Sequence, residues 1–215
     1  MSREMKDIWV QTVSGMEVDM LDPKPEHILL GDIAHSLARV ARFGGHTIGD
    51  VPWNVAQHSL LVERLMPEDA APADRLRALL HDAHEAYVGD MVSPVKWALD
   101  AESVQAYVRM GMKPSGMSPS AHWNTIVARL DAAIHAAFGL AIPDGAVAAA
   151  IKTADLTALA VEKELFMSPS RRPWSILPPL PDPMPVVEMP LAPRDAALLF
   201  LGRFHEIMDA RHGLN

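Results

Sequence analysis

The segment Leu79–Asp90 holds the densest group of polar side chains in an otherwise apolar part of the chain. His81 and Glu85 are four residues apart, and Asp82 and Glu85 are three apart, so a helix would place all three near one face. An imidazole and two carboxylates at the edge of a core cost several kcal/mol unless they are paired or bind a cation. Such nitrogen and oxygen ligands suit Mn, Fe, Co, Ni or Zn better than calcium. The spacing therefore predicts a metal site on this segment.

One helix cannot close such a site alone, so other elements must supply further ligands. His58 and Asp155 are polar residues within apolar segments of helical periodicity, and both are candidates. The chain has no cysteine, which excludes iron–sulfur clusters, thiolate zinc sites and disulfide scaffolds. Any bound metal must therefore use His, Asp and Glu side chains.

Apolar residues at intervals of three and four predict an all-α protein, and no stretch shows the two-residue alternation of a half-buried strand. We expect a single domain over residues 1–215, since domains usually span roughly 100–200 residues. Asp32 is expected to cap the first helix. The expected helices cover residues 32–43, 54–66 (with a start near Pro52 as the alternative), 73–89, 95–112, 121–138, 144–167 and 194–211.

Two segments lie outside this helical pattern. Residues 1–26 predict an extended leader that lies on the domain. Nine of the eighteen prolines lie between Pro169 and Pro193, where they exclude a regular helix or a central strand. We expect residues 169–193 to form an extended strap that brings the C-terminal helix, 194–211, back onto the body. A disordered loop is the alternative, and apolar residues such as Trp174 and Ile176 favour the docked strap.

The charge of the chain limits its partners. Nineteen basic and 27 acidic residues give a net charge of −8, which argues against binding a long nucleic acid but allows a small anion in a pocket. The first ten residues lack the apolar stretch of a signal peptide, and no run reaches the roughly 20 apolar residues that span a bilayer. We therefore expect a cytoplasmic protein without a membrane partner.

His58, the adjacent His81-Asp82 and the distant Asp155 resemble the H…HD…D metal-binding pattern of the HD-domain phosphohydrolase superfamily. Around this pattern the chain is similar to the branch that contains bacterial 5′-deoxynucleotidases and phage-type deoxyadenylate triphosphohydrolases. The similarity rests on the doublet with its following glutamate, on an Arg-aromatic pair, and on a segment close to S-V-A-E-H-S. These are His81-Asp82-x-x-Glu85, Gly89-Asp90, Pro94-Val95-Lys96, Arg42-Phe43 and Asn54–Ser59. The resemblance covers about residues 28–165 and implies an HD-domain helical bundle.

The resemblance implies a role for each of these residues. His58, His81, Asp82 and Asp155 would hold one divalent metal ion. Glu85 would orient or deprotonate the attacking water, unless it is a solvated carboxylate on a helix face. Asp90 would protonate the leaving oxygen or hold the sugar, although a turn carboxylate beside Gly89 is the alternative.

Four protein ligands leave room for water and substrate only where coordination exceeds four. This favours Mn²⁺ or Co²⁺ or an expanded Zn²⁺ site, with Fe²⁺ and Mg²⁺ also candidates. Arg42 and Lys96 would supply positive charge to the phosphate, with surface salt bridges as the alternative. Phe43 and His46 are further candidate substrate contacts. His84 could join a second metal or form hydrogen bonds in the outer shell of the site.

The resemblance implies a metal-dependent phosphohydrolase that acts on nucleotides, and we expect a 5′-nucleotidase for deoxynucleoside monophosphates. The small number of cations near the motifs favours a monophosphate. A deoxynucleoside triphosphate triphosphohydrolase and a non-catalytic nucleotide-binding module are the alternatives, and a structural protein with satisfied histidines is a third. Apolar positions on the last helix, including Leu198 and Leu199, predict a homodimer.

Overall fold

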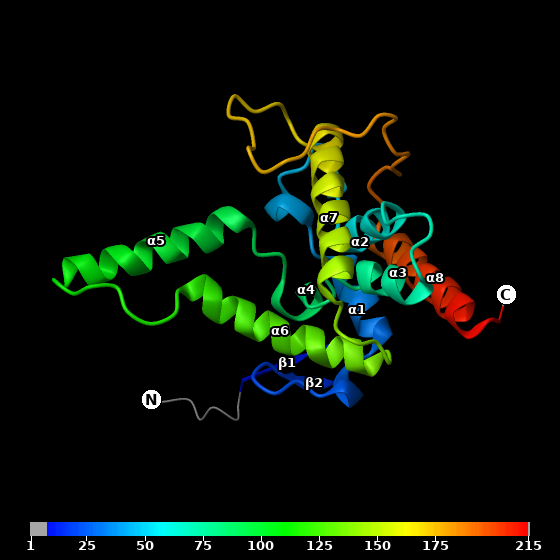
Figure 1. The fold of residues 1–215 in the computed structure, drawn as a ribbon, viewed down its shortest axis with the longest axis horizontal. Helices are drawn as coiled ribbons and strands as arrows, with labels where there is room; N and C mark the ends of the chain where they lie inside the picture. The colour runs from blue at the N-terminus through cyan, green and yellow to red at the C-terminus, as the bar shows by residue number, and fades with distance from the viewer. Residues whose placement is uncertain (1–7, 215) are drawn as a thin grey trace.

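Apolar residues at helical spacing form helices along most of the chain, as predicted. A computed structural model describes residues 8–214, and within that range the fold is mostly α-helical with one short hairpin of strands (Figure 1). The all-α prediction is therefore confirmed. The helices are α1 (Leu30–Leu37), α2 (Val55–Arg64), α3 (Pro72–Leu79), α4 (Glu85–Val88), α5 (Ser93–Arg109), α6 (Pro119–Ala137), α7 (Gly145–Phe166) and α8 (Pro193–His212).

Local capping explains where several helices begin. The side chain of Asn54 accepts a hydrogen bond from the backbone N–H of Gln57 at the start of α2. Asp144 caps α7 in the same way. The predicted cap at Asp32 is wrong, because this residue lies inside α1. Its carboxylate instead accepts hydrogen bonds from the backbone and hydroxyl of Ser14, at 3.1 and 2.7 Å.

The helix predicted over 73–89 is wrong, because the chain turns between α3 and α4 at the His-Asp doublet. Bonds of the i→i+3 type replace the α-helical ladder there, with Ala83 N donating to Leu80 O at 3.0 Å. The Nδ1 atom of His81 also donates a hydrogen bond to the carbonyl of Ala78 at the end of α3, at 2.9 Å. Leu80 and Ala83 remain fully buried through the turn, so the apolar periodicity continues although the helix does not.

The leader forms a small antiparallel hairpin of β1 (Trp9–Gln11) and β2 (Glu17–Asp19). The predicted extended conformation holds for its described part, and residues 1–7 lie outside the described range. Val18 on β2 is fully buried in the main hydrophobic core.

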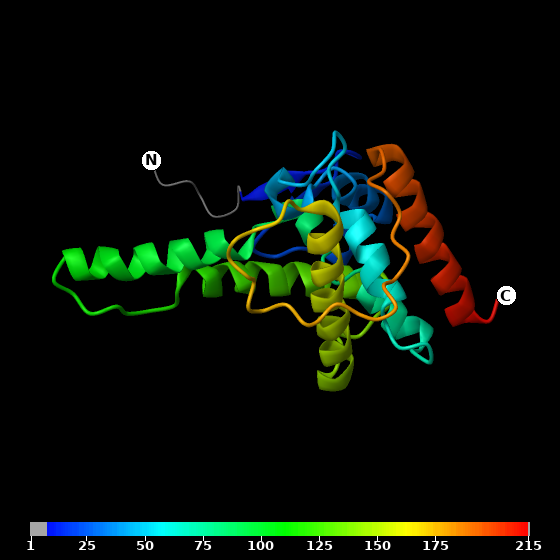
Figure 2. The same ribbon diagram turned by 90° about the horizontal axis from the view of Figure 1, so that it is seen from above.

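The main core joins α1, α2, α3, α4, α6 and α8, and a second cluster joins α2, α3 and α7. Helix α2 packs against α3, α7 and α8, so it lies at the centre of the body (Figure 2). Phe200 and Phe204 of α8 are buried in the main core. The core therefore extends beyond residues 28–165, and part of the α8 face that suggested a dimer is covered within the chain itself. Leu198 and Leu199 remain exposed.

Two features extend beyond this body. Helices α5 and α6 form a hairpin that projects to one side in both views, and α5 has no buried residue (Figures 1 and 2). The strap crosses over the end of α7 without helix or strand, as predicted, and returns to α8 (Figure 1). Trp174 is partly buried, but Ile176, also expected to dock, is 51% exposed. Gln57 of α2 anchors it, because its side chain donates to Met189 O at 3.1 Å and accepts from Leu191 N at 2.9 Å.

Candidate metal centre

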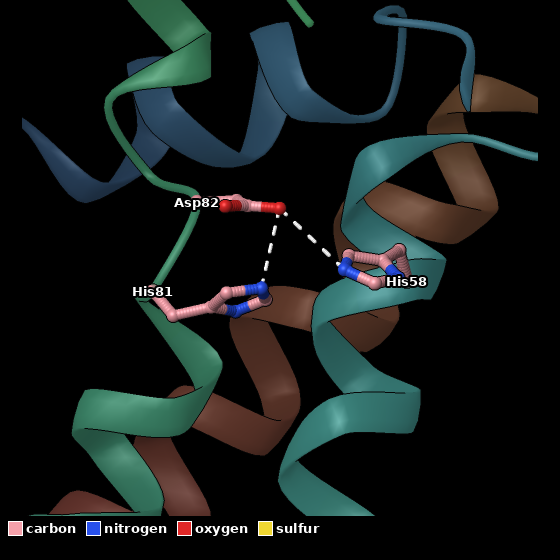
Figure 3. Close-up of side chains that lie close together, drawn as sticks. All are labelled: His58, His81 and Asp82. Carbon is pink, nitrogen blue, oxygen red and sulfur yellow. Dashed lines mark ion pairs between the residues drawn. The ribbon is translucent and has the colours of Figure 1, made fainter. Parts of the chain in front are cut away.

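Two imidazoles and a carboxylate converge between α2 and the turn that links α3 to α4. His58, His81 and Asp82 offer ligand atoms that all lie within 4.8 Å of one another (Figure 3). The Asp82 Oδ2 atom is 3.5 Å from His58 Nε2 and 3.2 Å from His81 Nε2. Asp155 joins from α7, with Oδ1 at 3.4 Å from His58 Nε2. The structure therefore brings the four predicted ligands together.

The hydrogen bonds of the two imidazoles test whether this group fits a metal ion. His58 Nδ1 donates to Glu162 Oε1 at 2.6 Å, and His81 Nδ1 bonds to the carbonyl of Ala78 at 2.9 Å. The Nε2 atom of each ring is buried and has no hydrogen-bond partner among the described residues. Both Nε2 atoms face carboxylate oxygens, which is the donor set of a Mn, Fe, Co or Zn site. The residues present therefore fit a divalent ion.

Glu162 is a functional residue that the sequence analysis did not single out. It is fully buried on α7, and its second oxygen lies 3.5 Å from Arg42 Nε. A carboxylate behind a ligating imidazole fixes the tautomer and the orientation of the ring. Glu162 follows Asp155 by seven residues, which is two helical turns on the same face. This spacing on an apolar helix could have identified it.

Mutual pairing shifts the pKa values of the candidate ligands. Burial alone would raise the pKa of Asp155, but His58 and His81 hold it well below its usual range. The same two imidazoles lower the pKa of Asp82 against the effect of burial. Burial and Arg42 oppose protonation of His58, but the facing carboxylates raise its pKa well above the usual value. Since metals bind neutral imidazole, metal binding at this site would release protons.

Glu85 begins α4 and lies at the edge of the same group. The residue is 8% exposed, and its Oε2 atom is buried and has no hydrogen-bond partner among the residues described. Burial, followed by the charges of Asp82 and Asp90, raises the pKa of Glu85 to about 9. Burial also raises the pKa of Asp90, although Arg42 opposes that shift. Both carboxyls thus have the perturbed pKa values common among acid–base groups.

Arg42 lies buried among these carboxylates. Its Nη1 atom is 3.5 Å from Asp90 Oδ2 and 3.9 Å from Asp82 Oδ2. Its backbone N–H donates to Trp53 O at 2.8 Å, which ties it to the segment before α2. The next residue, Phe43, has a φ of 56°, a conformation that bulky side chains rarely adopt. Such local strain often occurs at functional positions and here fixes the direction of the Arg42-Phe43 pair.

A cavity of about 440 Å³ opens beside this group. Its walls include seven of the ten predicted site residues: Arg42, Phe43, Asp82, Glu85, Asp90, Lys96 and Asp155. Trp97 of α5 and Trp174 and Ile176 of the strap also line it. His58 and His81 do not line it, and His46 is exposed outside it, so the structure does not support the prediction that His46 contacts substrate.

Fold and site together define an all-helical protein with a buried histidine–carboxylate centre beside a cavity. The chain is 36% identical over 217 residues to an uncharacterized protein of Rhodobacter capsulatus, covering 97% of this chain and all of the relative. It is 30% identical over 203 residues to the uncharacterized protein YfdR of Escherichia coli, covering 94% and 97% of the two chains. The chain therefore belongs to the family that includes these two proteins. No protein-family model matches the chain.

Within residues 8–214, no helix combines the length and apolar character that crossing a bilayer requires.

Proposed function

We propose that the protein is a divalent-metal-dependent phosphohydrolase of the HD-domain type, acting on nucleotides. The observation that carries this proposal is the His58, His81, Asp82 and Asp155 donor set beside a cavity that also presents Arg42 and Lys96. A divalent ion held by these four residues would polarise a phosphoryl oxygen and activate water. The remaining chemistry belongs to the residues of the chain.

Glu85 is placed to accept the proton of the attacking water, because it lines the cavity next to Asp82. A nearby divalent charge favours its ionised form, which is the form that accepts a proton. Asp90, whose pKa is raised by burial, suits the opposite task of donating a proton to the leaving oxygen. Arg42 and Lys96 would neutralise the phosphate charge that the acidic chain would otherwise repel.

The cavity lining combines charged and aromatic residues, which favours a nucleotide over a simple phosphate ester. The aromatic rings of Phe43, Trp97 and Trp174 offer surfaces on which a base could stack. The cations that line the cavity are Arg42, Lys96 and Lys152, which is a small set for a triphosphate tail. We therefore propose a deoxynucleoside monophosphate as the substrate, and a 5′-nucleotidase reaction that releases phosphate.

The direct test is the release of phosphate and of triphosphate from a panel of deoxynucleoside mono- and triphosphates with Mn²⁺, Co²⁺ or Mg²⁺. We expect phosphate from monophosphates. Triphosphate release would instead support a triphosphohydrolase, and nucleotide binding without turnover would support a binding module.

Variants assign the roles in this reaction. Glu85→Gln should reduce kcat by about 100-fold or more, since general base catalysis contributes roughly 10²–10⁴-fold, while the ligand set keeps its ion. His81→Ala should lose the ion and activity together. His122→Ala, at an exposed position on α6, is the matched control and should behave as the wild type. Full activity of Glu85→Gln would refute the assignment of Glu85 as the base.

A further inference from the structure

A second group of candidate ligands lies next to the first. Asp82, His84 and Glu85 also offer ligand atoms that all lie within 4.8 Å of one another. Asp82 belongs to both groups. His84 is the last residue before α4 and Glu85 is the first residue in it, so the turn that places the His-Asp doublet places these two side chains as well.

His84 is held in the same way as the two imidazoles of the first group. Its Nδ1 atom bonds to Asp131 Oδ1 of α6 at 3.0 Å, just as Nδ1 of His58 bonds to Glu162 and Nδ1 of His81 bonds to a carbonyl. In each ring this hydrogen bond occupies Nδ1, so Nε2 is the nitrogen that would bind a metal ion. A carboxylate behind an imidazole is the usual support of a metal-binding histidine.

Glu85 provides the independent observation. The residue is more than nine-tenths buried, and its buried Oε2 atom has no hydrogen-bond partner among the described residues. A buried carboxylate oxygen without a partner is costly, and a cation removes that cost.

The charge around the two groups also favours a further cation. Arg42 is the guanidinium buried among the carboxylates, and Lys152 pairs with Asp155 from the exposed rim at 2.7 Å. One divalent ion and the buried guanidinium carry three positive charges against five carboxylates if all of these are ionised, and Lys152 and Lys96 are the further cations on the cavity wall. The five carboxylates are Asp82, Glu85, Asp90, Asp155 and Glu162.

We propose that Asp82, His84 and Glu85 form a second divalent-cation site, which shares Asp82 with the first and takes Mn²⁺, Fe²⁺, Co²⁺ or Zn²⁺. Asp82 and Glu85 line the cavity, so the second ion would lie beside the bound phosphate. Glu85 has two oxygens, so one can bind a cation while the other stays available to water. The site deepens the proposed function, since paired ions suit the transfer of a phosphoryl group.

The test measures metal binding without substrate. The full-length protein is stripped with chelator and dialysed against Mn²⁺, and the bound ions per chain are counted by elemental analysis. We expect two for the wild type, one for His84→Ala, and two for the control His122→Ala. Electron paramagnetic resonance of the wild type should show two Mn²⁺ ions coupled through a shared ligand. One ion in the wild type, or two in folded His84→Ala, would overturn the second site.

A second variant separates loss of the second ion from a defect in folding. Asp131→Asn keeps every ligand but weakens the support of His84, so it should lower the affinity of the second ion by about 10-fold or more and leave the first unchanged. Equal affinity for the second ion in Asp131→Asn and the wild type would contradict the role of His84. Two bound ions without nucleotide hydrolysis would overturn the proposed function alone, whereas hydrolysis with one bound ion would overturn the second site alone.

Discussion

At the scale of single residues, the buried pair of His58 and Glu162 shows how the centre is prepared. An unpaired carboxylate would be unstable at zero exposure, so Glu162 depends on the His58 imidazole and the Arg42 guanidinium. In return it holds the His58 ring with Nε2 directed at Asp82 and Asp155. The same carboxylate thus orients a metal ligand and a candidate phosphate-binding cation.

We predict that Glu162→Gln lowers metal affinity by about 10-fold or more. The amide keeps the shape of the side chain but loses the charge that orients His58 and Arg42, and loss of such a partner typically costs 10–100-fold. Competition titration with a coloured chelator measures the change. Glu164→Gln, at an exposed position two residues further along α7, is the control and should bind metal as the wild type does. Unchanged affinity in Glu162→Gln would show that this carboxylate does not support the ligand.

The raised pKa of Glu85 predicts how stability depends on pH in chelator-treated protein. Its pKa is about 9 in the folded state against a usual value of 4.5, so between these values the folded state binds a proton that the unfolded chain does not. Stability must therefore fall as the pH rises from about 5 to 9. Glu85→Gln cannot titrate, so its Tm should fall less than that of the wild type over this range. Parallel Tm curves for the two proteins would contradict the pKa shift.

At the scale of secondary-structure elements, local sequence predicted most helices but not the turn that builds the centre. Caps such as Asn54 and Asp144 act on adjacent residues, so their effect can be read locally. The end of the helix after Leu79 could not be predicted from the sequence, because Leu80 and Ala83 keep the apolar spacing of a helix and are buried in the turn as well. The one-face argument for His81 and Glu85 was therefore wrong in geometry, although the turn still brings them to one site.

Contacts between distant elements also could not be predicted from the sequence. The ligand set could be predicted because each residue lies in a motif, and the resemblance connected the motifs. Glu162 bonds to His58 across 104 positions of sequence, and no local pattern encodes that pairing. The support of His84 by Asp131 depends in the same way on how α6 packs near α4.

Gly89 ends α4 and directs Asp90 into the site, so we predict that Gly89→Ala destabilises the protein. Its φ of 76° and ψ of 166° lie in a region that is essentially restricted to glycine, and the cost of another residue there is about 1–3 kcal/mol. A Cβ would meet no atom within 4 Å, so backbone strain alone is responsible. Gly202→Ala on α8 has equal space and an ordinary φ, and should instead stabilise by roughly 0.5–1 kcal/mol. Urea unfolding of both variants measures this contrast, and equal effects would contradict it.

At the scale of the whole molecule, the strap links the C-terminal part of the chain to the cavity. Gln57 binds its far end next to the ligand His58, and Arg64 of α2 pairs with Glu188 at 2.8 Å. Between α7 and this anchor, the strap brings Trp174 and Ile176 to the cavity wall. The strap therefore contributes to the site, although it lies outside the segment that resembles the HD-domain family.

The projecting hairpin bears on the expected homodimer, which stays a prediction. Helix α5 has no buried residue, and Trp97 and Val108 on it are 58% and 65% exposed. Exposed apolar side chains mark an interface where they form a contiguous patch.

Trp174 is the strap residue that we expect to contact the base of a nucleotide, and steady-state kinetics can distinguish this contact from a role in holding the strap in place. Its ring lies 6.1 Å from that of Phe43 at the cavity, and stacking of a base on an aromatic side chain contributes about 1–3 kcal/mol. If the proposed substrate is correct, Trp174→Ala should raise KM for a nucleotide by about 10-fold, while kcat changes less than about 2-fold because the metal ligands are untouched. Hydrolysis of a phosphate ester without a base should change little. Leu180→Ala, at an exposed strap position outside the cavity, is the control, and an equal change in both variants would show that Trp174 acts only by holding the strap in place.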